Sequence, residues 1–429
     1  MTTFLLAILL LIVMILIGIP VAYSMAATSM VYILIIMPTS LKILPLRALT
    51  GVNSFILMSI PFFILAAEIM VRTDISRKLF AFARLFIGRF RGGLAFVNVV
   101  ASTIFGSISG SAIGDMTGLG KIEIEEMTKE GYDRDFSIAI SAASSLQSPL
   151  IPPSTTAMVY AGCVSISTGA ILLGGIGPGL LIAGSQILYI LFTRKKNAYP
   201  RDEKTYTKEE KRQIIRDGLI AMMLPVIILG GILGGFCTAT EAAALAVAYA
   251  MILGYFVYKN LNAKVMKEIL GTTAKSIANI FTIVAFANAF SWAAGMEQIP
   301  SKLAELLNHI SSNPIVLLMI INVFYILAGM IMDVGAAIIL FAPILAPVMT
   351  KVGVDPIHFA VITITNLTMG VLTPPVGLVL FSAINVGRRP MDKIVKAMKP
   401  FLIMDVIILI LITVVPEVVT AIPNFFGYM

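Results

Sequence analysis

The chain has 429 residues, of which 58% are hydrophobic and only 13% are charged, and its mean hydropathy is +0.97. Soluble domains carry about 25% charged residues, so the composition excludes an ordinary soluble protein and predicts an all-α polytopic membrane protein. The net charge of +8 does not indicate nucleic-acid binding, because Lys and Arg gather in short loops, as the positive-inside rule describes. Two cysteines within apolar runs and two histidines form no cluster that would suit a transition metal.

The first 91 residues predict two membrane spans and a surface helix. Residues 4–36 are nearly all apolar and are expected to form one long, kinked span, since a span needs about 20 residues. A loop over 37–51, which contains Arg47, leads to a second span over 52–71. Basic residues interleaved with apolar ones at near-helical spacing over 72–91 predict an amphipathic helix that lies along the membrane surface.

The next hundred residues predict non-helical backbone within the membrane. Residues 92–128 have charged residues near both ends and are short for two full spans, which need about 40 residues, so we expect a re-entrant hairpin with its tip at 106–112. The apolar segment 135–163 is broken at Pro152-Pro153, because proline lacks an N–H and clashes with the preceding turn. A further span is predicted at 171–193.

The second half of the chain repeats this order at a constant offset. Pro374-Pro375 corresponds to Pro152-Pro153, and at the same offset MTKVGVD at 349–355 corresponds to MTKEGYD at 127–133. The match predicts a second hairpin over 315–350, with AGMIMDVGAAI at its tip, and a second broken span over 357–386. Paired, interrupted segments in two halves indicate a transporter binding site.

The remaining segments connect these units. A hydrophilic linker rich in Lys and Arg separates the halves, further spans are expected at 217–236, 238–258, 276–296 and 400–422, and lysines between 259 and 275 predict a cytoplasmic segment. The expected domain division is 1–91 (scaffold spans and surface helix), 92–193 (first half of a transport domain), 194–216 (cytoplasmic linker), 217–296 (scaffold spans of the second repeat), 297–386 (second half of the transport domain) and 387–429 (basic loop and last span).

Charge predicts how the two repeats are oriented. The flanks of the first hairpin carry nine Lys or Arg residues, whereas the equivalent flanks of the second carry two, Lys302 and Lys351. By the positive-inside rule the first hairpin enters from the cytoplasm and the second from outside, so the repeats are inverted. A count of nine crossings then places the N-terminus in the cytoplasm and the C-terminus outside, in the architecture of alternating-access transporters.

Both hairpin tips and both Pro-Pro breaks leave backbone groups unpaired at membrane depth, a cost that a bound ligand or water would offset. Oxygen ligands with few carboxylates suit a monovalent cation better than calcium, and sodium is the physical prediction. Helix N-termini at the same breaks could meet an anionic substrate group. The candidate ligands at the first tip are Ser107, Ser109, Gly110 and Ser111, which are expected to face Ser145, Ser148 and the carbonyls of 149–152. The candidate ligands at the second tip are Gly329, Asp333 and Gly335, which are expected to face Asn366, Thr368, Gly370 and Thr373.

Each of these features also has a purely structural interpretation. Small residues within spans often serve helix packing, and Asp333 could simply cap the hairpin tip. Asp115 could be a ligand or an N-cap, Glu241 could line a cavity or begin a helix, and Glu68 near a span end favours a structural role. Arg47 is either a solvated loop residue or a clamp for a substrate carboxylate.

The stretches GSISGSAIGD, SPLIPPS, MDVGAAIILFAPILAP and GVLTPPVG, in this order, resemble the large membrane subunit of tripartite ATP-independent periplasmic (TRAP) transporters, and the resemblance covers essentially the whole chain. The resemblance implies an ion-transporter-superfamily-like elevator fold and sodium-coupled uptake of an organic anion, not an enzyme. It also implies a bacterial inner-membrane location, a periplasmic binding protein that delivers the substrate and a small four-helix membrane subunit, here expected as a separate chain. Similarity is greatest to the sialic-acid branch, with C4-dicarboxylate members as the alternative; an ion channel is the competing function class.

The family pattern implies two Na⁺ sites and a set of substrate contacts. The first Na⁺ site would comprise Ser107, Ser109, Gly110, Ser111, Pro149, Ile151 and Pro152, and the second Gly329, Asp333, Gly335, Gly370, Thr373 and Pro374. The candidate substrate contacts are Arg47, Ser145, Ser154, Asn366 and Thr368.

Overall fold

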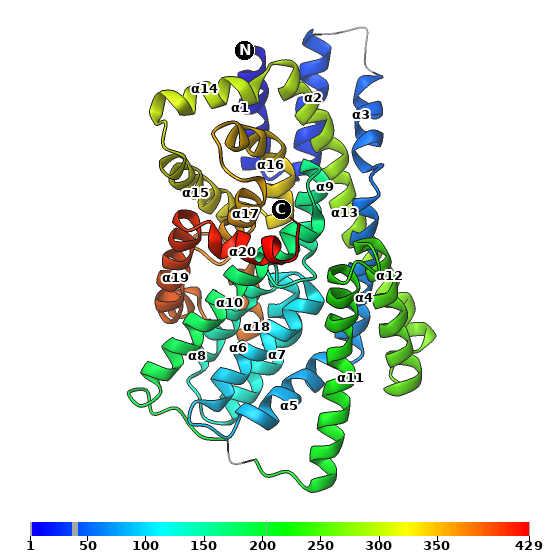
Figure 1. The fold of residues 1–429 in the computed structure, drawn as a ribbon, viewed down its shortest axis with the longest axis vertical. Helices are drawn as coiled ribbons and strands as arrows, with labels where there is room; N and C mark the ends of the chain where they lie inside the picture. Colours follow the sequence, from blue (N-terminus) through cyan, green and yellow to red (C-terminus); the bar gives the residue numbers. More distant parts are fainter. Residues whose placement is uncertain (1, 37–41, 203, 429) are drawn as a thin grey trace.

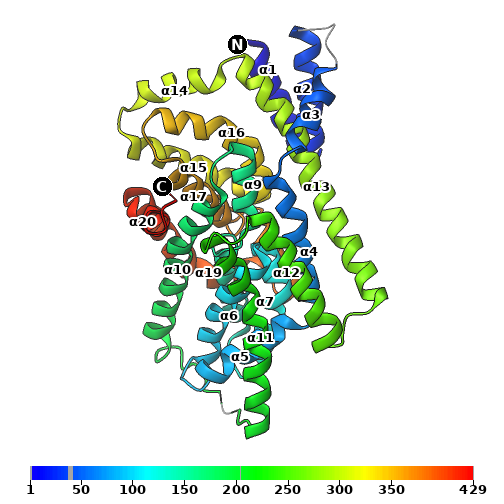
Figure 2. The same ribbon diagram turned by 45° about the vertical axis from the view of Figure 1, so that its right-hand side comes forward.

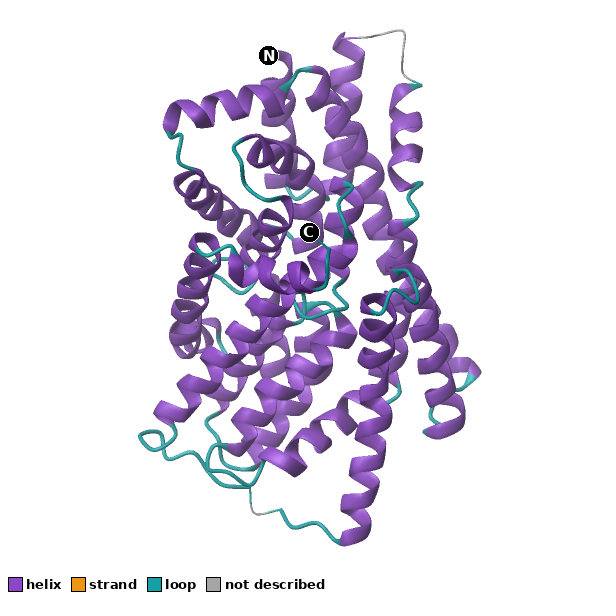
Figure 3. Ribbon diagram, in the orientation of Figure 1, coloured by secondary structure: helices purple, strands orange, loops and turns teal. Residues whose placement is uncertain are grey.

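A computed structural model describes residues 2–36, 42–202 and 204–428, and within these ranges it contains helices joined by loops, with no strand (Figures 1 and 3). The predicted all-α polytopic class is confirmed. In chain order the longer helices are α1 (Thr2–Leu16), α2 (Val21–Ile36), α3 (Ile43–Val52), α4 (Ser59–Arg72), α5 (Ile75–Ile87), α6 (Gly93–Ser109), α7 (Ala112–Lys129), α8 (Arg134–Ser144), α9 (Thr155–Val164), α10 (Thr168–Thr193), α11 (Lys208–Leu233), α12 (Ala239–Ile252), α13 (Ala263–Met296), α14 (Ile299–Ile310), α15 (Pro314–Ile331), α16 (Val334–Lys351), α17 (Pro356–Gly370), α18 (Leu378–Gly387), α19 (Met391–Val414) and α20 (Glu417–Phe425).

Both predicted hairpins are present. In the first, α6 ends at Gly110, whose φ of +58° reverses the chain, and α7 begins at once because the Ser111 hydroxyl accepts a hydrogen bond from the Gly114 N–H at 3.3 Å. In the second, α15 and α16 are separated only by Met332 and Asp333, and the Asp333 carboxylate accepts from the Gly335 N–H at 2.9 Å. Each tip therefore consists of the end of one helix and the capped start of the next.

Both predicted breaks are also present. Non-helical backbone containing Pro152-Pro153 separates α8 from α9, and equivalent backbone containing Pro374-Pro375 separates α17 from α18. Both Pro-Pro peptide bonds are cis. The repeat seen in the sequence thus relates two units of the same design, each with a hairpin followed by a broken helix.

The long helix α13 forms one side of the molecule, with α2, α3 and α4 packed along it (Figures 1 and 2). With 34 residues it is about 50 Å long, which exceeds the roughly 30 Å hydrocarbon core of a bilayer. Contact is closest at Gly51 of α3, where a Cβ atom would lie 2.5 Å from the Asn288 side chain. The hairpins and broken helices lie on the other side of this layer.

The expected single span over 4–36 is wrong. The chain turns at Gly18, with φ of +93°, and α2 runs back alongside α1 (Figure 1). Each helix has 15 or 16 residues and is about 23 Å long, too short to cross roughly 30 Å of hydrocarbon alone. The apolar run carried no charge that would have marked the reversal.

The prediction for the segment that leads to α4 is also wrong. Within the expected loop over 37–51, residues 43–52 form α3, and 37–41 lie outside the described residues. The helix continues after a bend of 63° into α4, so the expected span 52–71 is the second arm of a broken one. Lys264, Lys267 and Lys275 lie in the first part of α13, which is longer than a membrane span, so their cytoplasmic location stays a prediction.

By length and apolar composition, seven of the described helices could cross a membrane, or eight if the bent pair α3–α4 counts as one span. Figures 1 and 2 place α5, which lies in the predicted surface segment 72–91, and α14, which precedes the second hairpin, at opposite ends of the molecule. This placement agrees with inverted repeats. The start of α1 lies at the same end of the molecule as α14. The predicted cytoplasmic N-terminus and the predicted external position of α14 therefore conflict with each other. The count of nine crossings, from which the N-terminus was placed, is no longer supported.

The charge argument can be tested by labelling. In a background with Cys163 and Cys237 replaced by alanine, we expect cysteine introduced at Lys208, exposed at the start of α11, to react with a membrane-impermeant maleimide only from the cytoplasmic side. A cysteine at the exposed Ser312, between α14 and α15, is the matched position and should react only from outside. Labelling of both positions from one side would contradict the inverted arrangement.

Candidate functional site

The two hairpin tips meet at one cavity of about 280 Å³. One wall consists of the tips and the start of α9, and the opposite wall consists of α4 and α13. Segments far apart in sequence therefore enclose one space at the centre of the fold. The polar or tip residues that line it are Glu68, Ser109, Ser111, Gly114, Pro149, Thr155, Thr156, Ser276, Asp333 and Gly335.

The first tip is joined to the first Pro-Pro loop by direct contacts. The Thr155 hydroxyl donates to the Gly110 carbonyl at 2.9 Å, and a Cβ atom on Gly110 would lie 2.8 Å from the Pro153 oxygen. Gly106 packs equally closely against Ser148. The structure thus brings together the two segments of the first predicted sodium site.

Within that site the hydroxyls have local partners. Ser107, buried, donates to the Ile104 carbonyl at 2.5 Å, and Ser111 caps α7. The Pro149 carbonyl accepts from the hydroxyls of Ser154 and Thr156. Ile151 is buried, and its side chain lies against Gly179 of α10.

The second tip packs on the second Pro-Pro loop through glycines. A Cβ atom on Gly329 would lie 2.6 Å from the Leu367 carbonyl oxygen and 2.9 Å from the Gly370 Cα, and the Gly377 N–H donates to the Met330 carbonyl at 3.1 Å. The Thr373 hydroxyl donates to the Met369 carbonyl at 2.8 Å. Only glycine permits this approach, which brings the end of α15 against the end of α17 at the second Pro-Pro loop.

None of the five candidate substrate contacts is on the cavity wall. Arg47 is on α3 and not in a loop, and its guanidinium carbon lies 5.4 Å from the centre of the Trp292 ring. Ser145 and Thr368 are buried and donate to backbone carbonyls of their own helices, while Ser154 caps α9. The buried Asn366 amide donates to Asn322 on α15.

Sequence reasoning missed four polar residues of the wall. Thr155 and Thr156 directly follow the SPLIPPS motif, and they face the cavity because α9 begins there. Ser276 lies on α13 at the start of the predicted span 276–296, where it was not singled out as a ligand. Glu68, interpreted from sequence as structural, lines the cavity from α4.

The structure also resolves two open alternatives. Asp115 is not the N-cap of its helix; it is buried one turn into α7, where a carboxylate oxygen accepts from the Ser148 hydroxyl at 2.8 Å. Glu241 forms a capping box with Thr238 at the start of α12, as the alternative of a helix N-terminus predicted.

Comparison with known proteins assigns the family. Residues 8–418 match the family described as "Tripartite ATP-independent periplasmic transporter, DctM component". The chain belongs to the DctM family. As a DctM-family chain it is a multi-pass membrane permease component of a TRAP transporter for organic acid uptake and not an enzyme.

Relatives of this DctM-family chain align over nearly its whole length. It is 35% identical to the sialic acid TRAP transporter large permease protein SiaM of Vibrio cholerae over 96% of each chain. It is 31% identical to the C4-dicarboxylate TRAP transporter large permease protein DctM of Rhodobacter capsulatus, over 97% of this chain and 98% of that protein. The Alcanivorax borkumensis YdaH transporter, at 16% identity and a TM-score of 0.65 over 86% of each chain, shares the fold.

Proposed function

We propose that this permease carries out sodium-coupled uptake of an organic anion by an elevator motion, in which the hairpins and broken helices move as a transport domain against α4 and α13. The observation that carries the proposal is the single cavity enclosed by both hairpin tips on one side and by α4 and α13 on the other. An elevator mechanism requires a binding site that lies between a mobile transport domain, which carries the bound substrate, and a fixed scaffold.

The proposal of an anionic substrate rests on helix ends. Three helices begin at the cavity wall, since Ala112 of α7, Thr155 of α9 and Val334 of α16 all line it. Helix N-termini present N–H groups and a partial positive charge, which favour a carboxylate. The described residues of the wall include no Lys or Arg, so these ends are its sources of positive potential.

Charge balance supports sodium coupling. The charged side chains on the described wall are Glu68 and Asp333, both acidic. An anionic substrate placed beside two carboxylates would be repelled, so a bound cation at the tips would favour its binding. The oxygen-rich tips suit sodium, and this mutual dependence of ion and substrate is what coupling requires.

Sialic acid is the substrate that we propose, with a C4-dicarboxylate as the second candidate. Sialic acid has one carboxylate and many hydroxyls, which match the hydroxyls of Thr155, Thr156 and Ser276. A dicarboxylate would bring a second negative charge to a wall without a described cationic side chain. The relatives include both types, so the substrate is settled by measurement.

The proposal includes partners and location. A periplasmic binding protein would deliver the substrate, and a separate small membrane subunit would complete the scaffold, in the bacterial inner membrane. The test is uptake of labelled sialic acid and a C4-dicarboxylate into liposomes that hold this chain and its small partner. We expect uptake to need both the binding protein and an inward sodium gradient; uptake without a sodium gradient would overturn the coupling.

Substitution at each tip should weaken sodium activation. Ser107→Ala removes a hydroxyl at the first tip, while Asp333→Asn keeps an N-cap side chain at α16 and removes only its charge. Loss of one ligand is worth about 1 to 3 kcal/mol, so the sodium concentration for half-maximal uptake should rise roughly fivefold or more.

Ser185→Ala, which removes a similar local hydrogen bond within α10, is the control and should leave the sodium dependence unchanged. Wild-type sodium curves for both tip variants would contradict the site assignment.

A further inference from the structure

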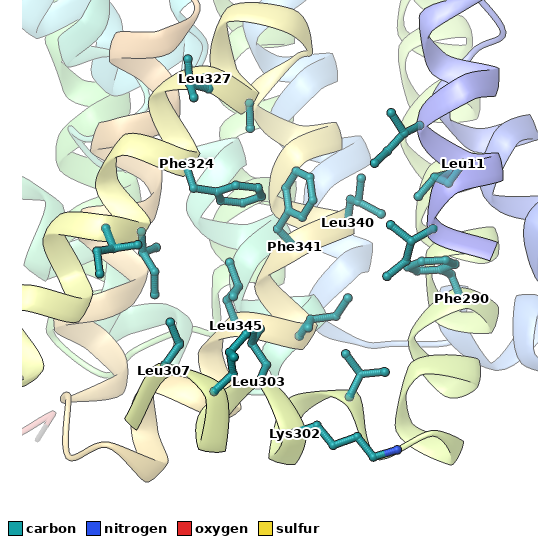
Figure 4. A pocket seen from close by; sticks show the side chains of 18 of the residues that line it. Leu11, Phe290, Lys302, Leu303, Leu307, Phe324, Leu327, Leu340, Phe341 and Leu345 are labelled. Atoms are coloured by element: carbon teal, nitrogen blue, oxygen red, sulfur yellow. The ribbon is translucent and has the colours of Figure 1, made fainter. Parts of the chain in front are cut away.

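A second cavity, of about 1030 Å³, lies between α1 and α13 on one side and α15 and α16 on the other, with α14 across one end. Its walls are almost wholly apolar, and Figure 4 shows Leu11, Phe290, Phe324, Leu340 and Phe341 around it. It is separate from the central cavity and shares none of its described lining residues. We call it the α14 chamber.

The α14 chamber is open toward the bilayer. Several of its lining side chains are among the most exposed apolar groups of the protein, including Leu306 at 58%, Leu327 at 54% and Ile12 at 48%. In a membrane permease such side chains face hydrocarbon and not water. An apolar cavity that opens to lipid is favourably filled by acyl chains, because an empty space would leave its lining side chains without packing contacts.

One end of the chamber is polar. Lys302, Glu305 and His309 of α14 line it, and their spacing of three and four residues places them on one face of the helix. Figure 4 shows Lys302 at the α14 edge, with Phe324 and Phe341 farther in. Lys302 donates one hydrogen bond to the Glu297 carbonyl at 2.7 Å and lies 4.0 Å from the Glu297 carboxylate, and its ammonium has three N–H donors in all.

The equivalent surface of the first repeat is covered by protein. The offset that carries Pro152 onto Pro374 relates α5 to α14, and α5 packs against α11, where a Cβ atom on Gly218 would lie 2.2 Å from the Phe82 ring. Lys78 of α5 also bonds Asp217 of α11 at 2.9 Å. Among the described residues α14 packs mainly against α13 and α16, and the chamber lies between it and α1.

We propose that the α14 chamber binds a zwitterionic phospholipid. Its acyl chains lie between α1, α13 and the second hairpin, its phosphate contacts Lys302 and His309, and its headgroup amine contacts Glu305. The opposite charges of Lys302 and Glu305 match the phosphate and ammonium of one headgroup, which an apolar helix of a partner protein would leave unpaired. This inference does not depend on the proposed substrate or on sodium coupling.

Fluorescence quenching provides the test, because the chain has one tryptophan. In a Trp292→Phe background, Phe341→Trp places the reporter in the chamber and Ile407→Trp, 59% exposed on α19, places a matched reporter on an ordinary lipid-facing surface. Both variants are reconstituted in phosphatidylcholine vesicles, and brominated phosphatidylethanolamine or phosphatidylglycerol is added in increasing fractions. Leu340→Trp serves as a second chamber reporter if Phe341→Trp does not fold.

We expect brominated phosphatidylethanolamine to quench the chamber reporter half-maximally at a mole fraction about fivefold lower than the mole fraction needed for the Ile407→Trp reporter. A fivefold difference corresponds to about 1 kcal/mol, the contribution expected from one cationic contact with the headgroup. Lys302→Gln should remove this preference, and Glu305→Gln should reduce the preference for phosphatidylethanolamine over phosphatidylglycerol. Equal quenching at both reporters, absence of quenching in the chamber, or loss of chamber quenching when the small membrane subunit is added would each overturn the proposal.

Discussion

Gly110→Ala is expected to abolish uptake and to lower the free energy of unfolding by roughly 2 to 4 kcal/mol. Gly110 has a φ of +58°, which costs an L-residue about 1 to 2 kcal/mol. An added Cβ atom would also lie 2.8 Å from both the Pro153 oxygen and the Thr155 nitrogen, which are backbone atoms that cannot move aside separately. The first tip would have to separate from the first Pro-Pro loop, and the predicted sodium ligands would separate with it.

Gly114→Ala is the matched control, because it lies on the same hairpin and lines the same cavity. A Cβ atom added to Gly114 would lie 3.5 Å from its nearest neighbour, which is an ordinary van der Waals contact, and Gly114 lies within the helix α7. We expect near-wild-type thermal stability in detergent and measurable uptake in liposomes. Similar behaviour of the two variants would show that the tip tolerates rearrangement and would contradict a close-packed ion site there.

Arg84→Met should destabilise the folded protein by about 3 to 5 kcal/mol, since it leaves the carboxylates that Arg84 binds, of which Asp202 is buried, without their counter-charge. Arg84 is 4% exposed and binds three of them. It donates to both oxygens of Asp202 at 2.6 and 2.8 Å, to Glu126 at 2.8 Å and to Glu130 at 2.5 Å. The interaction joins α5, the end of α7 and the linker before α11.

The Arg84 cluster should also determine acid sensitivity. Burial opposes ionisation of Asp202, but hydrogen bonds from Arg84 and the Lys204 N–H, together with the charges of Arg84 and Lys204, outweigh it and lower the pKa of its carboxyl. A depressed pKa in the folded state stabilises above the unfolded value of about 4, and this stabilisation is lost as the pH falls through the folded value. The wild type should therefore lose stability between about pH 5 and pH 3 more steeply than Arg84→Met.

Arg77→Met is the control for the Arg84 prediction. Arg77 is on the same helix, is exposed and should change stability by no more than about 0.5 kcal/mol. Thermal unfolding in detergent across this pH range measures both effects. An Arg84→Met protein as stable as Arg77→Met, with the wild-type pH slope, would show that the three carboxylates find other partners.

The internal repeat made most of the transport half predictable. Pro152-Pro153 and Pro374-Pro375 cannot lie within a continuous helix, and glycines near both tips marked the reversals, so local chemistry determined the hairpins and the breaks. The reversal at Gly18 and the helical state of Arg47 depend on packing against α13, and an apolar run contains no sign of which neighbour it will meet. Sequence likewise grouped Arg84 with the surface charges, because its carboxylate partners are 42 to 118 residues away.

The candidate site was predictable only in part, for a related reason. The hairpin tips are specified by turn chemistry and form where the sequence predicts them, whereas wall residues depend on which helix faces the tips. Ser145, Ser154 and Thr368 were selected as free hydroxyls beside a break, but each is hydrogen-bonded within its own segment. Thr156 and Ser276 face the cavity because of where α9 begins and how α13 is rotated, which the motif alone does not specify.

The bend between α3 and α4 has a mechanical consequence. The offset between the two repeats places the counterparts of α3 and α4 within the unbroken α13, so equivalent positions form a joint of 63° in one repeat and a continuous rod in the other. A continuous helix such as α13 resists bending far more than two short helices, such as α3 and α4, that are joined by a few non-helical residues. The two repeats therefore share a fold but differ in stiffness, and any change of shape in the helices that flank the cavity should concentrate at Asn53–Phe55 while α13 keeps its form.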